Sequence, residues 1–304
     1  IVLQHDGGTG SIGTSGSPIR TSSLNGVGSA NLTVGFSDVP SGGPGSAFID
    51  HSGDVIFKHD VQTPMEFKLV TSGNLTTQNI NYLGATSDIV LQSGGMLTVQ
   101  SNSNIYGKNV TLIADKLDIQ SSSSVNSGGS SGEVLWVQPK TSLTKVDLGS
   151  GSDSTSGTLE LSIPEVSALL AGSGTLRIGC GCSGDVHFSG DVNVVSNSEV
   201  FEVESGAAIT QGAVSGFVQA GKLLLKAKGN VDLNNPSNSV ASLAGAINGS
   251  GAEHFSFKNS GNLIVDVVGG TSGISISGFS AYSAGSPDGV ITLDASGTIG
   301  QAPS

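Results

Sequence analysis

Basic and aromatic residues are scarce in this chain of 304 residues. Lys and Arg number 12 against 24 Asp and Glu, so the net charge is −12, and the only arginines are Arg20 and Arg177. Nucleic acids and anionic membranes bind basic surfaces, so we expect neither as a partner. No apolar run approaches the roughly 18 residues of a membrane span. The first ten residues show no signal-peptide pattern, so a secretion signal is expected to lie outside this sequence.

Cysteine is almost absent as well, and the two that occur form the pair Cys180-Gly-Cys182. Two cysteines this close cannot hold distant parts of a fold together. Thiolates two residues apart could bind a soft metal, but His187 is the only further ligand nearby. We therefore predict no metal site and no cofactor. A small disulfide and a pair of free thiols at a turn both remain open.

Gly and Ser, in contrast, make up about a third of the chain, and 36% of the residues are hydrophobic. Gly and Ser at this level suggest disorder, but so many Val, Ile and Leu residues must be buried somewhere. Short runs of alternating apolar and polar residues, flanked by Gly, Ser, Asn or Asp, recur along the chain. Each run predicts a strand with one buried face, as at 66–70, 95–99, 116–120 and 222–227.

The spacing of these runs indicates a repeat. Leu75 and Leu97 are 22 residues apart, Leu97 and Leu117 are 20 apart, and Leu117 and Val134 are 17 apart. A period near 20 residues with several strands per repeat is typical of a solenoid. We predict an all-β fold, a right-handed parallel β-helix of roughly 13 to 15 coils that rise about 4.8 Å each. An array of β-sandwiches fits less well, because the chain has one Trp and no evident linker.

Two regions depart from the repeat. Residues 1–50, with a Gly- and Pro-rich stretch at 39–48, are expected to form an irregular start or incomplete coils, and 51–304 to form the β-helix repeats. Residues 163–172 predict one short helix near 164–171, with Pro164 in its first turn, Glu165 after it and Gly172 at its end. The final strand has no polar cap after it, so we expect the chain to be a slice of a longer protein.

The most enzyme-like group of side chains lies near the start of the repeats. Pectate-lyase β-helices use calcium-bound carboxylates and an arginine base, and calcium needs six to eight oxygen ligands. The two arginines are expected to lie far from this group. We therefore interpret its members as solvated turn residues beside one strand: Asp50, His51, Asp54, His59 and Asp60.

Paired carboxylates offer a second enzymatic possibility, because glycosidases use two of them across a groove. Asp185 and Asp191 open successive predicted strands, and Glu202 and Glu204 share one face of another. Among 24 carboxylates some pairs will be close by chance, so we predict no catalytic residue. Sequons are interpreted as turn Asn followed by strand Thr or Ser rather than as glycosylation sites, at Asn31, Asn74, Asn109 and Asn248.

The order of the strand phrases carries a resemblance. KVDLG is followed by LELSIPEVSALLAGSGTLRIG, SGDVHFSGDVNV, KLLLKAKGNVDLNNPSNSVASLAGAI, HFSFKNSGNLIVDVVGGTSGISISG and GVITLDASGTIGQ, at 145–149, 159–179, 183–194, 222–247, 254–278 and 289–301. Over roughly residues 50–304 the chain resembles the filamentous haemagglutinin-like family of large secreted bacterial β-helical exoproteins. Cys180 and Cys182 depart from the family's cadence, which usually has small polar residues after GTLRIG.

The resemblance implies a structural or adhesive stalk segment of an extracellular, cell-surface protein, without enzymatic activity. The implied partners are glycans or proteins on another cell or matrix. Two-partner secretion implies a further partner in the outer membrane. The alternative from another class is a polysaccharide-cleaving β-helix enzyme, a lyase or a hydrolase, although the shortage of Trp, Tyr and Arg disfavours an enzymatic groove.

Overall fold

The computed structural model describes residues 2–5, 11–22, 30–36, 46–58, 66–80, 88–151, 153–277 and 289–302. They belong to two compact units, Ile1–Lys140 with Ala168–Gly174, and Thr141–Ser167 with Thr175–Ser304. Most of the Gly- and Pro-rich stretch at 39–48 lies outside the described residues, as do His59 and Asp60. Within the described ranges, no helix is long and apolar enough to cross a membrane.

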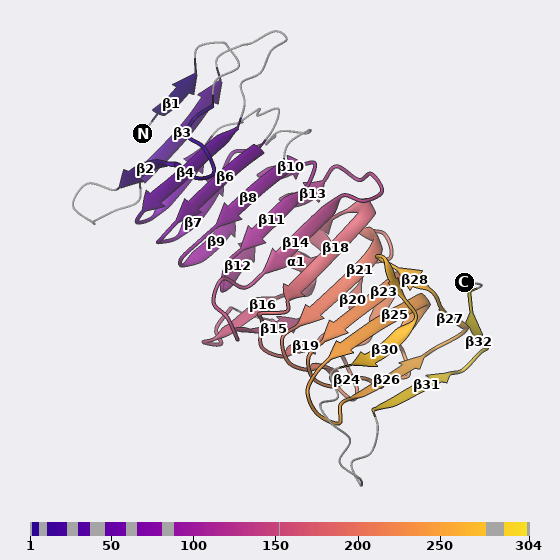
Figure 1. Ribbon diagram of the computed structural model, residues 1–304. Coiled ribbons are helices and arrows are strands. Elements are labelled where there is room, and N and C mark those ends of the chain that lie inside the picture. Colours follow the sequence, from indigo (N-terminus) through magenta and orange to yellow (C-terminus); the bar gives the residue numbers. More distant parts are fainter. Residues whose placement is uncertain are drawn as a thin grey trace. The chain divides into compact units, whose positions relative to one another are not determined.

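Three parallel ladders build the first unit (Figure 1). One ladder contains β2 (Ile19–Ser22), β4 (Ala47–Ser52), β6 (Glu66–Thr71), β8 (Asp88–Gln92), β11 (Val110–Ile113) and β14 (Val134–Gln138). A second contains β1 (Val2–His5), β3 (Ala30–Phe36), β5 (Val55–Lys58), β7 (Leu75–Gln78), β9 (Met96–Val99) and β12 (Lys116–Ile119). The third contains β10 (Asn104–Gly107), β13 (Ser124–Ser127) and β17 (Leu169–Leu170).

The register of these ladders confirms the repeat. Leu75 pairs with Leu97, and Leu97 pairs with Leu117. All three side chains are buried, so the apolar residues of successive coils form a continuous interior column. The predicted step from Leu117 to Val134 is wrong, because Val134 belongs to β14, which pairs with β11 in the other ladder.

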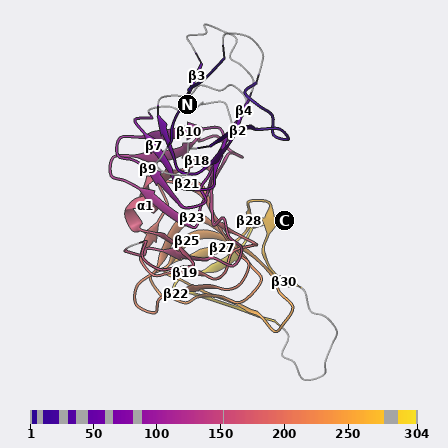
Figure 2. The ribbon, with the colours of Figure 1, turned by 90° about the vertical axis from the view of Figure 1, so that its left-hand side faces the viewer.

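The second unit repeats this architecture with two long ladders. One contains β16 (Thr158–Leu161), β15 (Lys145–Leu148), β19 (Val186–Phe188), β22 (Ile209–Gln211), β24 (Val231–Leu233), β26 (His254–Asn259) and β31 (Val290–Ala295). The other contains β18 (Gly172–Cys180), β21 (Ser198–Ser205), β23 (Val218–Ala227), β25 (Ser239–Asn248), β27 (Leu263–Val265) and β32 (Ile299–Gln301). β20 (Val192–Asn193) also pairs with β23, and β30 (Ile274–Ser277) pairs with β25. Figure 2 shows the same strands from a second side.

One antiparallel pair of strands lies on the outer face of this unit. β28 (Val267–Val268) and β29 (Thr271–Ser272) form a short hairpin that contacts β25. Val268 of the hairpin packs with Leu224 and Ala244, and all three residues are buried. Outward-facing apolar residues on β23 and β25 are therefore covered by the hairpin instead of facing solvent.

The predicted helix exists but is shorter than expected. α1 spans Ile163–Ala168, and Leu169–Leu170 form β17 because they pair with β13. Ser162 and Glu165 form a capping box, in which the Ser162 backbone amide donates to Glu165 Oε2 at 2.8 Å. At the other end, the buried Asn197 donates from Nδ2 to the carbonyls of Val166 and Ser167 at 3.2 and 3.1 Å.

Asp and Asn side chains connect successive coils at the turn just before a strand. Asp54 Oδ1 accepts from the backbone amide of Asn74 at 2.7 Å, and Asn74 Oδ1 accepts from that of Met96 at 2.8 Å. The second unit repeats the contact, because Asn230 Oδ1 accepts from the amide of His254 at 3.0 Å. The backbone groups freed by each sharp corner are thus satisfied by the neighbouring coil. The predicted all-β parallel β-helix with one short helix is confirmed in each unit.

Candidate functional site: a charged cluster beside a Cys-Gly-Cys turn

The structure separates the residues of the lyase-like group. On β4, Asp50 is half-buried and points outward, whereas His51 is fully buried among the core residues. Asp54 is one of the acceptors between coils described above. The interpretation as solvated turn residues is therefore wrong for His51, and Asp50, His51 and Asp54 do not converge on one metal.

The expectation that both arginines lie far from this group is also wrong. β2 pairs with β4 so that Arg20 stands directly beside Asp50. The two residues are 30 positions apart, and the masked loop between β2 and β4 makes that step longer than the 20-residue period. A spacing argument from the regular coils could not place Arg20.

His51 is an interior histidine with a defined partner. Its Nδ1 lies 2.8 Å from Thr21 Oγ1 on the neighbouring coil. Burial lowers the pKa of His51, and this effect outweighs the hydrogen bond with the Asp54 backbone and the attraction of Asp50 and Asp54, which raise it. The ring is therefore neutral and structural near pH 7.

The carboxylates of Asp185 and Asp191 are occupied by backbone contacts. Asp185 Oδ1 accepts from the amide of Ala208 at 3.2 Å, and Asp191 Oδ1 accepts from that of Gly216 at 2.9 Å. Lys145 Nζ also lies 3.8 Å from Asp185 Oδ2. Both aspartates belong to the set of acceptors that join one coil to the next.

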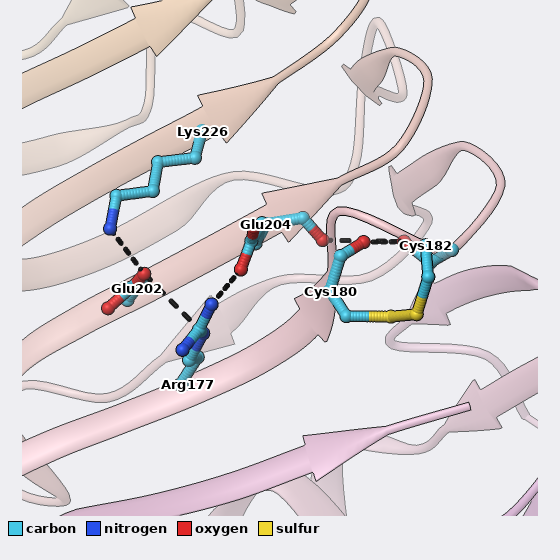
Figure 3. A network of polar contacts seen from close by, with 7 residues as sticks. Arg177, Cys180, Cys182, Glu202, Glu204 and Lys226 are labelled. Atoms are coloured by element: carbon cyan, nitrogen blue, oxygen red, sulfur yellow. Dashed lines mark hydrogen bonds and ion pairs between the residues drawn. A yellow bond between two sulfur atoms is a disulfide. The ribbon is translucent and has the colours of Figure 1, made fainter. Parts of the chain in front are cut away.

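Glu202 and Glu204, in contrast, do form a cluster with basic residues on the outer face of the second unit (Figure 3). Arg177 on β18 lies between them: its Nε is 3.5 Å from Glu202 Oε1, and its Nη2 contacts Glu204 Oε2. Lys226 on β23 reaches Glu202 Oε1 at 2.9 Å. The predicted shared face of the two glutamates is thus correct, and each glutamate is paired with a cation.

The Cys-Gly-Cys pair lies at the end of β18, beside this cluster (Figure 3). Cys180 and Cys182 form a disulfide. Cys180 through Ser183 make one tight turn, which is closed by a 2.9 Å hydrogen bond from the Ser183 amide to the Cys180 carbonyl. The Ser183 hydroxyl donates to the same carbonyl at 2.8 Å. The disulfide therefore joins the first and third residues of a β-turn.

The two sulfur-bearing residues differ in accessibility. Cys180 is 5% exposed, whereas Cys182 is an exposed residue. A Cβ atom on Gly181 would lie 3.0 Å from Glu204 Oε1. The Glu204 carboxylate therefore lies against the middle residue of the turn.

A second tight turn, Thr141 through Thr144, stacks on the first. The Leu143 amide donates to the Cys182 carbonyl at 2.8 Å, and the Thr144 amide donates to the Thr141 carbonyl at 3.3 Å. Leu143 has φ 66° and is 75% exposed. Left-handed backbone costs a non-glycine residue roughly 1–2 kcal/mol, and such strain is concentrated at functional sites in proteins. No pattern in the sequence marks this leucine, which occupies a position that Gly or Asn usually fills.

His187 does not join the cysteines. Its Nδ1 lies 2.9 Å from Thr210 Oγ1 on the next coil. In the described part of the chain, no three His, Cys, Asp or Glu residues are arranged to hold a metal ion.

Two of the four sequon asparagines act as acceptors between coils. Asn74 Oδ1 accepts from the amide of Met96, and Asn109 Oδ1 from that of Val134, both at 2.8 Å. Asn248 Oδ1 accepts from the Ser277 hydroxyl at 2.7 Å. Asn31 lies within β3. These contacts agree with the interpretation of Asn74 and Asn109 as turn residues.

Sequence reasoning missed a buried carboxylate, Glu160. It accepts hydrogen bonds from the Thr155 amide and hydroxyl, both at 2.8 Å, and from the Ser150 hydroxyl at 2.9 Å. Burial alone would raise the pKa of Glu160, but these hydrogen bonds outweigh it and lower the pKa. Glu160 anchors the loop between β15 and β16 and does not face an open groove.

Comparisons with models of protein families, with curated proteins and with solved structures each found no match. The fold and the geometry of the site therefore carry the functional argument.

Proposed function

We propose that the chain is a structural and adhesive stalk segment of a secreted cell-surface exoprotein. Its loops and outward-facing side chains attach to glycans or proteins on another cell or matrix. The resemblance to filamentous haemagglutinin-like exoproteins supports this proposal, as does the parallel β-helix architecture on which that family is built. Export through an outer-membrane partner belongs to the same proposal.

One observation carries the proposal: the register repeats outward side chains from coil to coil. On the outer face of the first unit, Val90 pairs with Thr111, and Thr111 pairs with Trp136. All three are half-buried. An accessible aromatic ring in line with a hydroxyl suits a sugar, which offers both apolar ring faces and hydroxyl groups. Repeated weak contacts of this kind add up when several copies engage one surface.

The disulfide supports the extracellular part of the proposal. Disulfides persist in secreted and periplasmic compartments and are rare in the reducing cytosol. The acidic net charge of −12 keeps a repetitive rod of this kind from associating with its own copies.

The test compares monomeric protein with the same protein displayed in several copies on beads, over glycan arrays and immobilised matrix proteins. We expect binding by the multivalent form, at least about 100-fold tighter than by the monomer. Trp136→Ala should weaken it, whereas Lys140→Ala, a change at an exposed position two residues beyond β14, should not. Thermal unfolding of both variants controls for folding.

Two outcomes oppose the proposal. Multivalent protein that binds no glycan and no matrix protein would remove the adhesive function. Unsaturated uronides or new reducing ends after incubation with pectin or alginate and Ca²⁺ would replace it with the polysaccharide-cleaving alternative.

A further inference from the structure

We infer that the Cys180–Cys182 disulfide is a thiol-exchange site, at which Cys182 takes up an external thiol as a mixed disulfide. This inference does not depend on the proposed adhesive function. It rests on the exposure of one sulfur-bearing residue, the burial of the other, and the charged and strained groups around the turn.

The disulfide is placed for reaction rather than for holding the fold together. It joins residues two positions apart within one turn, which hydrogen bonds from Ser183 already close. Exposed disulfides are the labile and regulatory ones, because an attacking thiolate must reach one sulfur along the line of the S–S bond. The coil architecture around the turn does not need this bond.

The difference in burial decides which sulfur is attacked. An incoming thiolate attacks Sγ of the exposed Cys182 and forms a new S–S bond there. The bond to Cys180 breaks, and its electron pair stays on the Cys180 sulfur, which takes up the proton that the incoming thiol released. The Cys180 thiol remains beside the mixed disulfide and can reverse the reaction by attacking Cys182 again. No net oxidant or reductant is consumed.

The surroundings of the turn select the charge of the ligand. The Glu204 carboxylate lies against Gly181, between the two cysteines. Its negative charge, in a chain with a net charge of −12, disfavours an anionic thiol and favours a cationic one. The exposed and strained Leu143, in the turn that stacks on Cys182, adds an apolar contact for the rest of the ligand.

The first test uses the whole folded chain and cysteamine as a cationic thiol. After incubation the reaction is stopped with acid, free thiols are alkylated, and peptides are mapped by mass spectrometry. We expect cysteamine on Cys182 and the alkyl group on Cys180. Cysteamine on Cys180, or no mixed disulfide in the folded chain, would overturn the inference.

Two single-cysteine variants form a matched pair. Cys180→Ser leaves Cys182 as a free thiol, and Cys182→Ser leaves Cys180. With the disulfide cystamine as the probe, Cys182 should react at least about tenfold faster than Cys180 in folded protein, and denaturant should abolish the difference. Equal rates in the folded variants would contradict the assignment of Cys182. Circular dichroism confirms that each variant folds, and the experiment on the unaltered chain does not depend on either.

The charge selection has its own test. The rate with cysteamine is divided by the rate with the anionic thioglycolate, which cancels any change in the leaving sulfur. Glu204→Gln should lower this ratio about twofold to fivefold at low salt. Glu199→Gln, on the same strand but paired with Lys222, should leave it nearly unchanged. A ratio that Glu204→Gln does not lower would contradict the role of Glu204.

Discussion

The side chain of Asn238 donates to the backbone carbonyl of Lys258 at 2.9 Å, twenty residues further along the chain. The same side chain accepts from the Val218 amide at 2.9 Å, twenty residues earlier. One buried asparagine therefore connects three successive coils of the second unit. It takes the place of an apolar residue at a corner where three backbone segments leave polar groups unpaired.

Replacement of this asparagine should be costly. Asn238→Ala leaves buried backbone groups without partners, and each such group costs about 1–3 kcal/mol. We expect a loss of about 2–4 kcal/mol, measured as a lower urea midpoint of the second unit. The exposed Asn234 provides the control, because Asn234→Ala should cost less than about 0.5 kcal/mol. Equal losses from both changes would contradict the role given to Asn238.

Two glycines meet where coils of the second unit pass each other. Gly149 has φ 99°, and a Cβ atom on it would lie 2.3 Å from the Gly190 Cα. Gly149→Ala combines a left-handed backbone with a clash against main chain, so we expect a loss of about 3 kcal/mol or more in thermal or urea unfolding. Gly151→Ala should be almost neutral, because a Cβ there meets nothing within 4 Å. A Gly149→Ala chain as stable as the original would disprove the close approach.

The charged cluster should contribute more than an isolated surface pair. Glu202 has a side chain only 10% exposed and contacts both Arg177 and Lys226. Glu202→Gln leaves two cations without their shared carboxylate, and we expect a loss of about 1–3 kcal/mol, reduced by the partial exposure of the cations. Glu199, 44% exposed in its pair with Lys222, serves as the comparison, and Glu199→Gln should cost at most about 1 kcal/mol. Urea midpoints at low and high salt measure both.

His51 should make the first unit sensitive to acid. Its pKa is lowered in the folded chain, so below about pH 6.5 the unfolded chain binds more protons than the folded one. Stability should therefore fall as the pH drops below that value, by at most about 1.4 kcal/mol per pH unit from this residue. The difference between the original chain and His51→Gln, followed by urea midpoints from pH 7.5 to 5, isolates this contribution from the other histidines. Parallel pH curves for the two chains would show that His51 does not titrate in this range.

Alternation and period were enough to predict the fold class from the sequence. The interior columns around Leu75, Leu97 and Leu117 follow directly from a 20- to 22-residue spacing. Strands with few apolar residues were missed, such as β13 with the sequence SVNS. Such a strand forms because its backbone pairs with β10 on the preceding coil, and pairing across coils leaves no local signal.

The candidate site was only partly predictable for the same reason. The shared face of Glu202 and Glu204 follows from alternation along one strand. Their contact with Arg177 depends on the register between β18 and β21, which insertions in the intervening loop can shift by several residues. The strain at Leu143 depends on the turn stacked against it, and an exposed leucine in a loop carries no periodic pattern.

The aspartates and asparagines at the turns have a consequence for how the chain can be built. At this corner the acceptor belongs to the earlier coil and the donor to the later one, as with Asp54 and Asn74, and again with Asn74 and Met96. A segment that has already wound therefore offers a vacant oxygen to whichever length of polypeptide emerges next. Growth from the amino end can proceed one rung at a time on a prepared template, without waiting for the whole molecule to be available.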